Sequence, residues 1–314
     1  MKVIITHLKI IHSQDKKIFK SLEEAQNIFL LNCYQKLKSI DTDIMFLCCP
    51  TQYHGRGDSV YIKEFCKNFP DDMLLIWTGR EVCSQVLSAP DTEYFIQNTG
   101  HRPLYWDNYP VNDMVMKWEM HLGPYKHRDP EILDNSDGII LNIMEYPEST
   151  LIPLKTAADF FKQKREYDPM ESWEKAINEL LPEQIAKHFR NFALFNFKSM
   201  LYPYFSNYKL IWDMIDLVNL PDGNAEKNLK SFLKKNMDSY KVLIKNKKIP
   251  VICELLPWIK KYRVTLKYIK YYAGCKSKNM LKRLISYIPK TYYYFRFLLD
   301  RHEIFQLEML DILV

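Results

Sequence analysis

The segment from Trp106 to Asp113 holds an unusual combination of side chains for a stretch of this length. Its letters are WDNYPVND, so two carboxylates, two amides and two aromatic rings fall within eight residues. An indole ring can cover the apolar face of a sugar, while Asp and Asn side chains form hydrogen bonds with its hydroxyl groups. The composition favours a sugar-binding segment, although Asp, Asn and Pro also form ordinary turns.

Polar residues follow other apolar runs of the first half in the same way. The runs are Val3–Ile11, Ile44–Pro50, Met73–Gly79, Pro103–Asn108 and Leu151–Ala157. Three of them begin at 44, 73 and 103, and a spacing of about thirty residues is typical of βα units in a parallel sheet. A complete (β/α)8 barrel needs eight strands and carries its active site where the strands end. With at most five candidate strands, we predict an α/β fold with a partial TIM (β/α)8 barrel of about four to five strands.

The second half has a different texture, because glycine nearly disappears and helical spacing of apolar residues takes over from about residue 168. The predicted helices are Ser172–Phe192, Ala225–Ile244, Ile249–Tyr272, Lys278–Tyr287 and Tyr292–Leu313, with Pro203, Pro221 and Pro289 between them or at their ends. An earlier helix is predicted to begin at Ser21, because Ser21 and Glu24 form a capping-box pattern. We therefore expect a barrel domain over residues 1–165 and an α-helical bundle domain over residues 166–314.

Composition excludes several other classes. Hydrophobic residues make up 47% and charged residues 26% of the chain, as in soluble globular proteins, and the net charge is +6. Seven cysteines without a CxxC pair indicate neither a disulfide framework nor a zinc site, and we expect no metal and no cofactor. No apolar run reaches the length of a membrane span and no signal peptide is seen, so a cytoplasmic or nuclear location is expected.

Residues 260–301 hold twelve Lys or Arg and one acid, with tyrosines between them. Such interleaving occurs in nucleic-acid binders, and it also occurs on the solvated face of a helical bundle. The second interpretation is favoured, because charge runs on helices are commonly exposed faces.

Several segments, taken together and in order, resemble glycoside hydrolase family 84, the O-GlcNAcases and bacterial β-N-acetylglucosaminidases. The matching segments are CPTQYHG (49–55), LIWTGREVCS (75–84), RPLYWDNYPVND (102–113), LGPYKHRDPE (122–131), NIMEYPES (142–149), KTAADFF (155–161), YDPMESWEKAI (167–177) and IPVICELLPWIKKYRVT (249–265). The resemblance implies hydrolysis of β-linked N-acetylglucosamine, as in O-GlcNAc-modified proteins, with retention of configuration. It also implies a substrate-assisted mechanism, in which the acetamide oxygen of the sugar attacks the anomeric carbon.

The resemblance also assigns roles to residues of this chain. The implied sugar contacts are Tyr53, Trp106, Asp107, Asn108, Asp113 and Asn142. The implied pocket wall is the WTG element, Trp77, Thr78 and Gly79.

The residues that should perform acid–base catalysis are not found. In the family an adjacent Asp pair ends the fourth barrel strand, and the matching strand here would precede the helix at Ser21. One alignment places the pair near Ile5 and Thr6, and another places it at Gln14 and Asp15. Asp15 is therefore a weak candidate for the general acid, and a solvated loop residue is the alternative.

The other adjacent pair, Asp71 and Asp72, precedes a strand and would lie at the opposite end of the barrel, where residues usually serve stability. We therefore expect a truncated and catalytically impaired O-GlcNAcase-like hydrolase. The alternative is a non-catalytic sugar-binding or helical interaction remnant of the same fold. A half barrel exposes sheet edges, so a second copy or a partner chain is expected to complete it.

Overall fold

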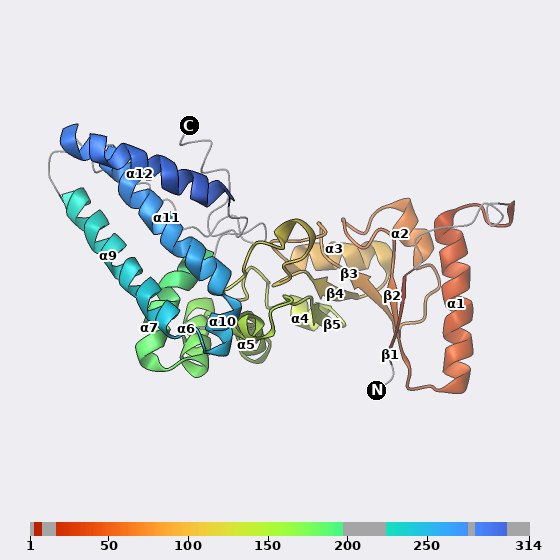
Figure 1. Ribbon diagram of the computed structural model, residues 1–314. Helices are drawn as coiled ribbons and strands as arrows, with labels where there is room; N and C mark the ends of the chain where they lie inside the picture. Colours follow the sequence, from red (N-terminus) through yellow and green to blue (C-terminus); the bar gives the residue numbers. More distant parts are fainter. Residues whose placement is uncertain (1–2, 8–16, 197–223, 276–279, 300–314) are drawn as a thin grey trace. The chain divides into compact units, whose positions relative to one another are not determined.

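The computed structural model describes residues 3–7, 17–196, 224–275 and 280–299 (Figure 1). By its internal contacts the chain divides into two compact units. The first comprises residues 1–109, 126–142 and 163–166, and the second comprises residues 110–125, 143–162 and 167–314. The chain thus passes between these two units more than once. The domain boundary near residue 165 stays a prediction.

The first unit is built on a five-stranded parallel sheet (Figure 1). Its strands are β1 (Val3–His7), β2 (Met45–Cys49), β3 (Met73–Trp77), β4 (Pro103–Asp107) and β5 (Gly138–Leu141). They are hydrogen-bonded in the order of the sequence, β1-β2-β3-β4-β5. Because successive right-handed crossovers advance in one direction, their helices are placed on one face of the sheet, as in a barrel wall.

The packing confirms this arrangement. The helices of the unit are α1 (Leu22–Ile40), α2 (Val60–Phe65), α3 (Ala89–Thr99) and α4 (Ile132–Asn135), and a short 3-10 helix, η3, spans Lys164–Glu166. All four α-helices contribute to one core with alternate strand residues, among them Phe46, Leu75 and Tyr105. Leu47, Ile76 and Leu104 have the opposite parity and form a separate buried cluster on the other face. The predicted partial barrel is therefore confirmed.

The predicted start of α1 is also confirmed. The Ser21 hydroxyl accepts a hydrogen bond from the Glu24 N–H at 3.2 Å. The Glu24 carboxylate accepts from the N–H of Lys20 at 2.6 Å, one residue earlier than in the usual capping box. Both bonds satisfy backbone donors that have no partner inside the helix.

One predicted strand is wrong. The run Leu151–Ala157 lies inside helix α5 (Pro147–Gln163) of the second unit. Its buried positions Ile152, Thr156 and Phe160 recur every four residues, a helical spacing that the apolar composition of the run obscured. The fifth strand is instead β5, whose four residues are too few to show a period.

The remaining helices of the second unit form its core (Figure 1). They are α6 (Pro169–Leu180), α7 (Glu183–Ala193), α9 (Asn224–Lys245), α10 (Pro250–Glu254), α11 (Leu256–Cys275) and α12 (Met280–Leu299), with 3-10 turns η2 (Met114–Met116) and η4 (Leu194–Asn196). Trp173, Phe189, Trp258 and Tyr262 are buried together at its centre. The predicted helical domain is present, as the similar structures described below also indicate.

The boundaries of these helices differ from the predicted ones at proline. The predicted helix Ser172–Phe192 is two helices, because Pro182 separates α6 from α7. Pro289 was predicted to separate two helices, but it lies inside α12. Pro203, Pro221 and the part of the predicted helix beyond residue 299 lie outside the described residues. Over the part of the chain that the structure describes, no helix is long and apolar enough to cross a membrane.

Candidate functional site

The carboxyl ends of the strands gather most of the predicted site residues at one edge of the sheet. Tyr53 follows β2, Thr78 and Gly79 follow β3, Asn108 follows β4, and Asn142 follows β5. Because the strands are parallel neighbours, these positions lie along a single edge, as they do at the catalytic face of a barrel.

Three of the predicted sugar contacts are joined by hydrogen bonds. The Asn108 side-chain oxygen accepts from Trp106 Nε1 at 3.2 Å and from Asn142 Nδ2 at 2.9 Å. The Asn108 amide nitrogen donates to the carbonyl of Val82 at 2.6 Å, in the loop after β3. Trp106, Asn108 and Asn142 are each half-buried, so the network is fixed and still reaches the surface. We call these three residues the Trp-Asn-Asn network.

The loops after β2 and β3 are joined to each other through their backbones. The carbonyl of Tyr53 accepts from the N–H of Thr78, and the carbonyl of Gly79 accepts from the N–H of Gly55, both at 2.9 Å. Gly79 has a φ of +91°, and a Cβ at this position would lie 2.5 Å from Ser84 Oγ. Glycine is therefore required here, both for the backbone conformation and for the close approach of the loop.

The ring of Trp77 does not face an open surface of this wall. It is 2% exposed and stacks on Phe95 with 4.4 Å between ring centroids, within the helix-covered core. Its Nε1 donates to the carbonyl of Gly55 at 3.0 Å. Trp77 thus shapes the predicted wall by holding a loop, and its ring belongs to the hydrophobic core.

Asp107 forms a buried ion pair that the sequence did not reveal. Its two carboxylate oxygens accept from Arg128 Nε at 2.8 Å and Arg128 Nη2 at 2.6 Å, and both side chains are 2% exposed. The rest of the guanidinium donates to three backbone carbonyls: Gln85 at 3.1 Å, Lys126 at 2.8 Å and Ser84 at 3.5 Å. All five N–H groups of an arginine are thereby used, and three segments are tied together.

This arrangement gives Asp107 a structural role. Two of its lone pairs are occupied by a planar, charge-assisted fork, which is a strong form of ion pair. Direct contact of Asp107 with a sugar stays a prediction. No spacing rule connects an aspartate at a strand end with an arginine twenty-one residues later, so local pattern did not identify Arg128.

The other candidate carboxylates do not join this network within the described residues. Asp113 is exposed, belongs to the second unit and precedes η2, where its backbone carbonyl accepts from the N–H of Met116 at 2.8 Å. Its contact with a sugar stays a prediction. Asp15 lies outside the described residues. Asp72 accepts a hydrogen bond from the Tyr34 hydroxyl and forms an ion pair with Lys38 at 2.7 Å. Neither of these partners is a predicted site residue.

Burial lowers the pKa values of two residues beside Arg128. It lowers the pKa of Lys126 to about 8. Burial is also the largest cause of the lowered pKa of His127, and the neighbouring charges of Lys126 and Arg128 act in the same direction. A pKa of about 8 leaves Lys126 mostly protonated at neutral pH, so Lys126 adds to the positive charge of this loop.

Comparison with known proteins agrees with this geometry. The sequence model of the beta-N-acetylglucosaminidase family, NAGidase, matches residues 5–194. The chain belongs to this family. The resemblance to glycoside hydrolase family 84 is thereby confirmed, and the match includes the whole Trp-Asn-Asn network.

Members of the family with similar sequences include the protein O-GlcNAcases of Rattus norvegicus and Mus musculus. Each is 29% identical over 154 residues, which are 47% of this chain and 16% of the relative. The chain thus spans about one sixth of the length of these curated relatives.

Solved structures of the family are similar over most of the chain. An O-GlcNAc hydrolase variant from Thermobaculum terrenum has a TM-score of 0.83 and 27% identity, covering 95% of this chain and 67% of that one. CpGH84B has a TM-score of 0.76 and 21% identity, covering 90% and 52%, and it supports the fold alone.

Proposed function

We propose that this chain supplies the sugar-holding side of an O-GlcNAcase-type site that releases β-linked N-acetylglucosamine from proteins. The observation that carries the proposal is the Trp-Asn-Asn network at the carboxyl ends of β4 and β5. An indole beside two amides offers an apolar face and several donors and acceptors, which a pyranose with equatorial hydroxyls requires. The names of the relatives, protein O-GlcNAcase and O-GlcNAc hydrolase, support the choice of sugar.

The proposed mechanism is retaining and substrate-assisted. The sugar acetamide attacks the anomeric carbon, and the chain orients the ring through Tyr53, Asn108 and Asn142. Asp107 acts through Arg128 by holding the end of β4 against the loop after β3, so that Asn108 reaches the carbonyl of Val82. Correct placement of a bound sugar depends on such fixed neighbours, because small displacements of contacting groups reduce rates strongly.

We propose further that hydrolysis by these 314 residues is impaired. The strand before α1 is β1, whose sequence is VIITH, and it holds no carboxylate. The acid–base pair of the family is expected at that strand end, and Asp15 is the remaining candidate in the following residues. Non-catalytic recognition of the sugar is therefore the second candidate function.

Binding is tested by titrating the chain with N-acetylglucosamine and with N-acetylgalactosamine, which differs only in the orientation of one hydroxyl group. We expect the indole signal of Trp106 in NMR spectra to shift with N-acetylglucosamine and to lose the shift in Asn142→Ala. Asn32→Ala is the matched control, because Asn32 is an asparagine on α1 whose side chain donates only to the helix carbonyl of Ile28 at 2.9 Å. Equal responses to both sugars, or none to either, would contradict the proposal.

Hydrolysis is tested with an aryl N-acetyl-β-glucosaminide. The proposed impairment predicts no turnover above the buffer rate. Turnover that disappears in Asp15→Ala would overturn the impairment and would identify Asp15 as the general acid. Sugar binding without turnover, in the parent chain and in Asp15→Ala, would support non-catalytic recognition.

The partner and the location are proposals as well. In the described part of the sheet, β1 pairs only with β2 and β5 only with β4, so both outer strands offer backbone groups for pairing. We propose that further strands, from a second copy or another chain, occupy these edges, and size-exclusion chromatography with light scattering tests the second copy. The proposed cytoplasmic or nuclear location is tested by fractionation of the cells that express the protein.

A further inference from the structure

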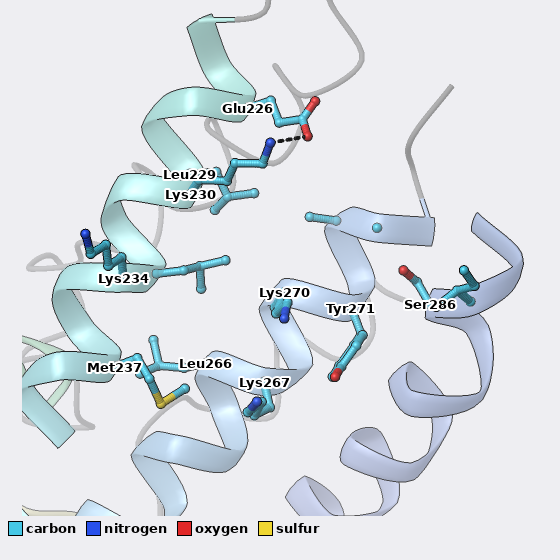
Figure 2. A pocket seen from close by; sticks show the side chains of 14 residues that line it. Glu226, Leu229, Lys230, Lys234, Met237, Leu266, Lys267, Lys270, Tyr271 and Ser286 are labelled. Atoms are coloured by element: carbon cyan, nitrogen blue, oxygen red, sulfur yellow. Dashed lines mark ion pairs between the residues drawn. The ribbon is translucent and has the colours of Figure 1, made fainter. Parts of the chain in front are cut away.

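The second unit contains a cavity that has no part in the proposed sugar site. It has a volume of about 590 Å³ and lies between α9, α11 and α12 (Figure 2). None of the predicted sugar contacts lines it. Cavities of about 300–1,000 Å³ with mostly apolar walls are typical of sites for small organic ligands.

The interior of this cavity is aliphatic. Leu229 and Met237 enter it from α9 and Leu266 from α11, and Figure 2 shows these side chains between the two helices. Leu229 and Leu266 are buried, at 4% and 0% exposed. A ligand that fills this space must therefore present an apolar surface.

Helices α11 and α12, which line the cavity, approach each other closely. Gly274 of α11 faces Ser286 of α12, and a Cβ at Gly274 would collide with the Ser286 side chain. The rings of Tyr271 and Tyr293 stack nearby, 5.7 Å apart and 9° from parallel. Close contact between α11 and α12 therefore forms one side of the cavity.

The border of the cavity is strongly positive. Its ionisable lining residues are Lys230, Lys234, Lys267, Lys270 and Glu226. Glu226 pairs with Lys230 at 3.0 Å, and four lysines against one glutamate leave three positive charges. Within the described ranges, no carboxylate lies within 4.0 Å of Lys267 or Lys270. The Lys270 ammonium lies 5.4 Å from the ring of Tyr271, which does not neutralise it.

We propose that this cavity binds a single-chain anionic amphiphile, such as a medium- or long-chain carboxylate. The apolar chain occupies the space between Leu229, Met237 and Leu266, and the head group meets the ammonium groups of Lys267 and Lys270. Lysine stems lie along apolar surface while their charged ends reach water, so the same side chains line the cavity and hold the anion.

The test uses decanoate as the probe and the whole chain, with the methionine methyl groups labelled for NMR. The signal of Met237, assigned by its loss in Met237→Leu, is expected to shift on titration and to saturate below the concentration at which decanoate forms micelles. Decyltrimethylammonium has the same chain with the opposite charge, and acetate has the head group without the chain. Neither is expected to shift this signal.

The variant Lys267→Gln/Lys270→Gln tests the head-group contact. We expect it to weaken decanoate binding about tenfold, because each exposed ion pair makes a modest contribution. The control Lys235→Gln/Lys260→Gln removes two exposed lysines from α9 and α11 that do not line the cavity, and it is expected to leave the affinity unchanged.

Three results would overturn the proposal. The first is an equal response of Met237 to decyltrimethylammonium, which would show that the charge has no role. The second is an equal loss of affinity in the two double variants, which would show that net charge alone acts. The third is no response to decanoate at any concentration below micelle formation.

Discussion

Replacement of Arg128 by methionine tests whether the buried ion pair holds the predicted site together. The change keeps most of the side-chain volume and removes the guanidinium donors to the Asp107 carboxylate and to the three carbonyls. Asp107 is 2% exposed, so its charge would remain buried without its partner. Removing one partner of a buried pair costs about 3–5 kcal/mol, mostly because the other charge is left uncompensated.

The effect should be local before it is global, so hydrogen exchange read by mass spectrometry is the suitable assay. The segments that Arg128 joins include Ser84 and Gln85 in the loop after β3 and Lys126 before α4. A loss of about 3–5 kcal/mol corresponds to at least a hundredfold faster exchange where opening is limited by this contact. We expect this acceleration in residues 80–88 and 124–130, and a weaker effect in α1.

Arg80→Met is the matched control. Arg80 forms an ion pair with Asp91 at 2.6 Å in the same unit, but its side chain is 56% exposed. Exposed pairs contribute about 0–1 kcal/mol, so this variant should exchange almost as the parent does. The double variant Asp107→Asn/Arg128→Met should recover part of the loss, because it removes the buried charge. Equal effects of Arg128→Met and Arg80→Met would refute the reasoning.

Three further changes have expected outcomes. Gly79→Ala should lower the free energy of unfolding by more than about 1 kcal/mol, because φ at this position is +91° and the new methyl group would press on Ser84. Urea unfolding measures this free energy. Glu254→Gln should cost about 1 kcal/mol in the same assay, because this carboxylate accepts from the N–H of Ser149 at 2.8 Å in the first turn of α5. Burial lowers the pKa of His121 to about 3, against about 6.5 when unfolded, so its contribution to stability is full above pH 6.5 and is lost as the pH falls from there toward 3. His121→Leu should flatten that part of the stability profile, whose slope is at most about 1.4 kcal/mol per pH unit.

Local pattern was sufficient for much of the fold. The apolar runs at β2, β3 and β4 were found because each is followed by a turn and begins about thirty residues after the last. β5 was missed because four residues surrounded by polar ones show no period. Pro289 was taken as a break, yet α12 continues through it. Proline costs a helix one hydrogen bond, and contacts with α11 compensate for that loss in a way that no local rule predicts.

The contacts of the candidate site were predictable only in part. The apolar runs placed Gly79 and Asn108 at strand ends, whereas the strand before Asn142 was not predicted. The structure brings the side chains of Asn108 and Asn142 within 2.9 Å. The partner of Asp107 could not be predicted, because Arg128 comes from a loop whose position depends on the whole sheet. The predicted role of Asp15 stays a prediction, because this residue lies outside the described ranges.

The alternation of side chains along a β-strand explains why Trp106, Asp107 and Asn108 (the letters WDN) make two separate sets of contacts. Successive side chains of a strand point to opposite faces, and Tyr105 belongs to the helix-covered core while Trp106 joins the cluster on the other face. Asp107 has the parity of Tyr105 and meets Arg128, whereas Asn108 has the parity of Trp106 and accepts its indole N–H. The ion pair with Arg128 holds Asp107 at the strand end, so Asp107→Asn should weaken the tie between the end of β4 and the loop after β3.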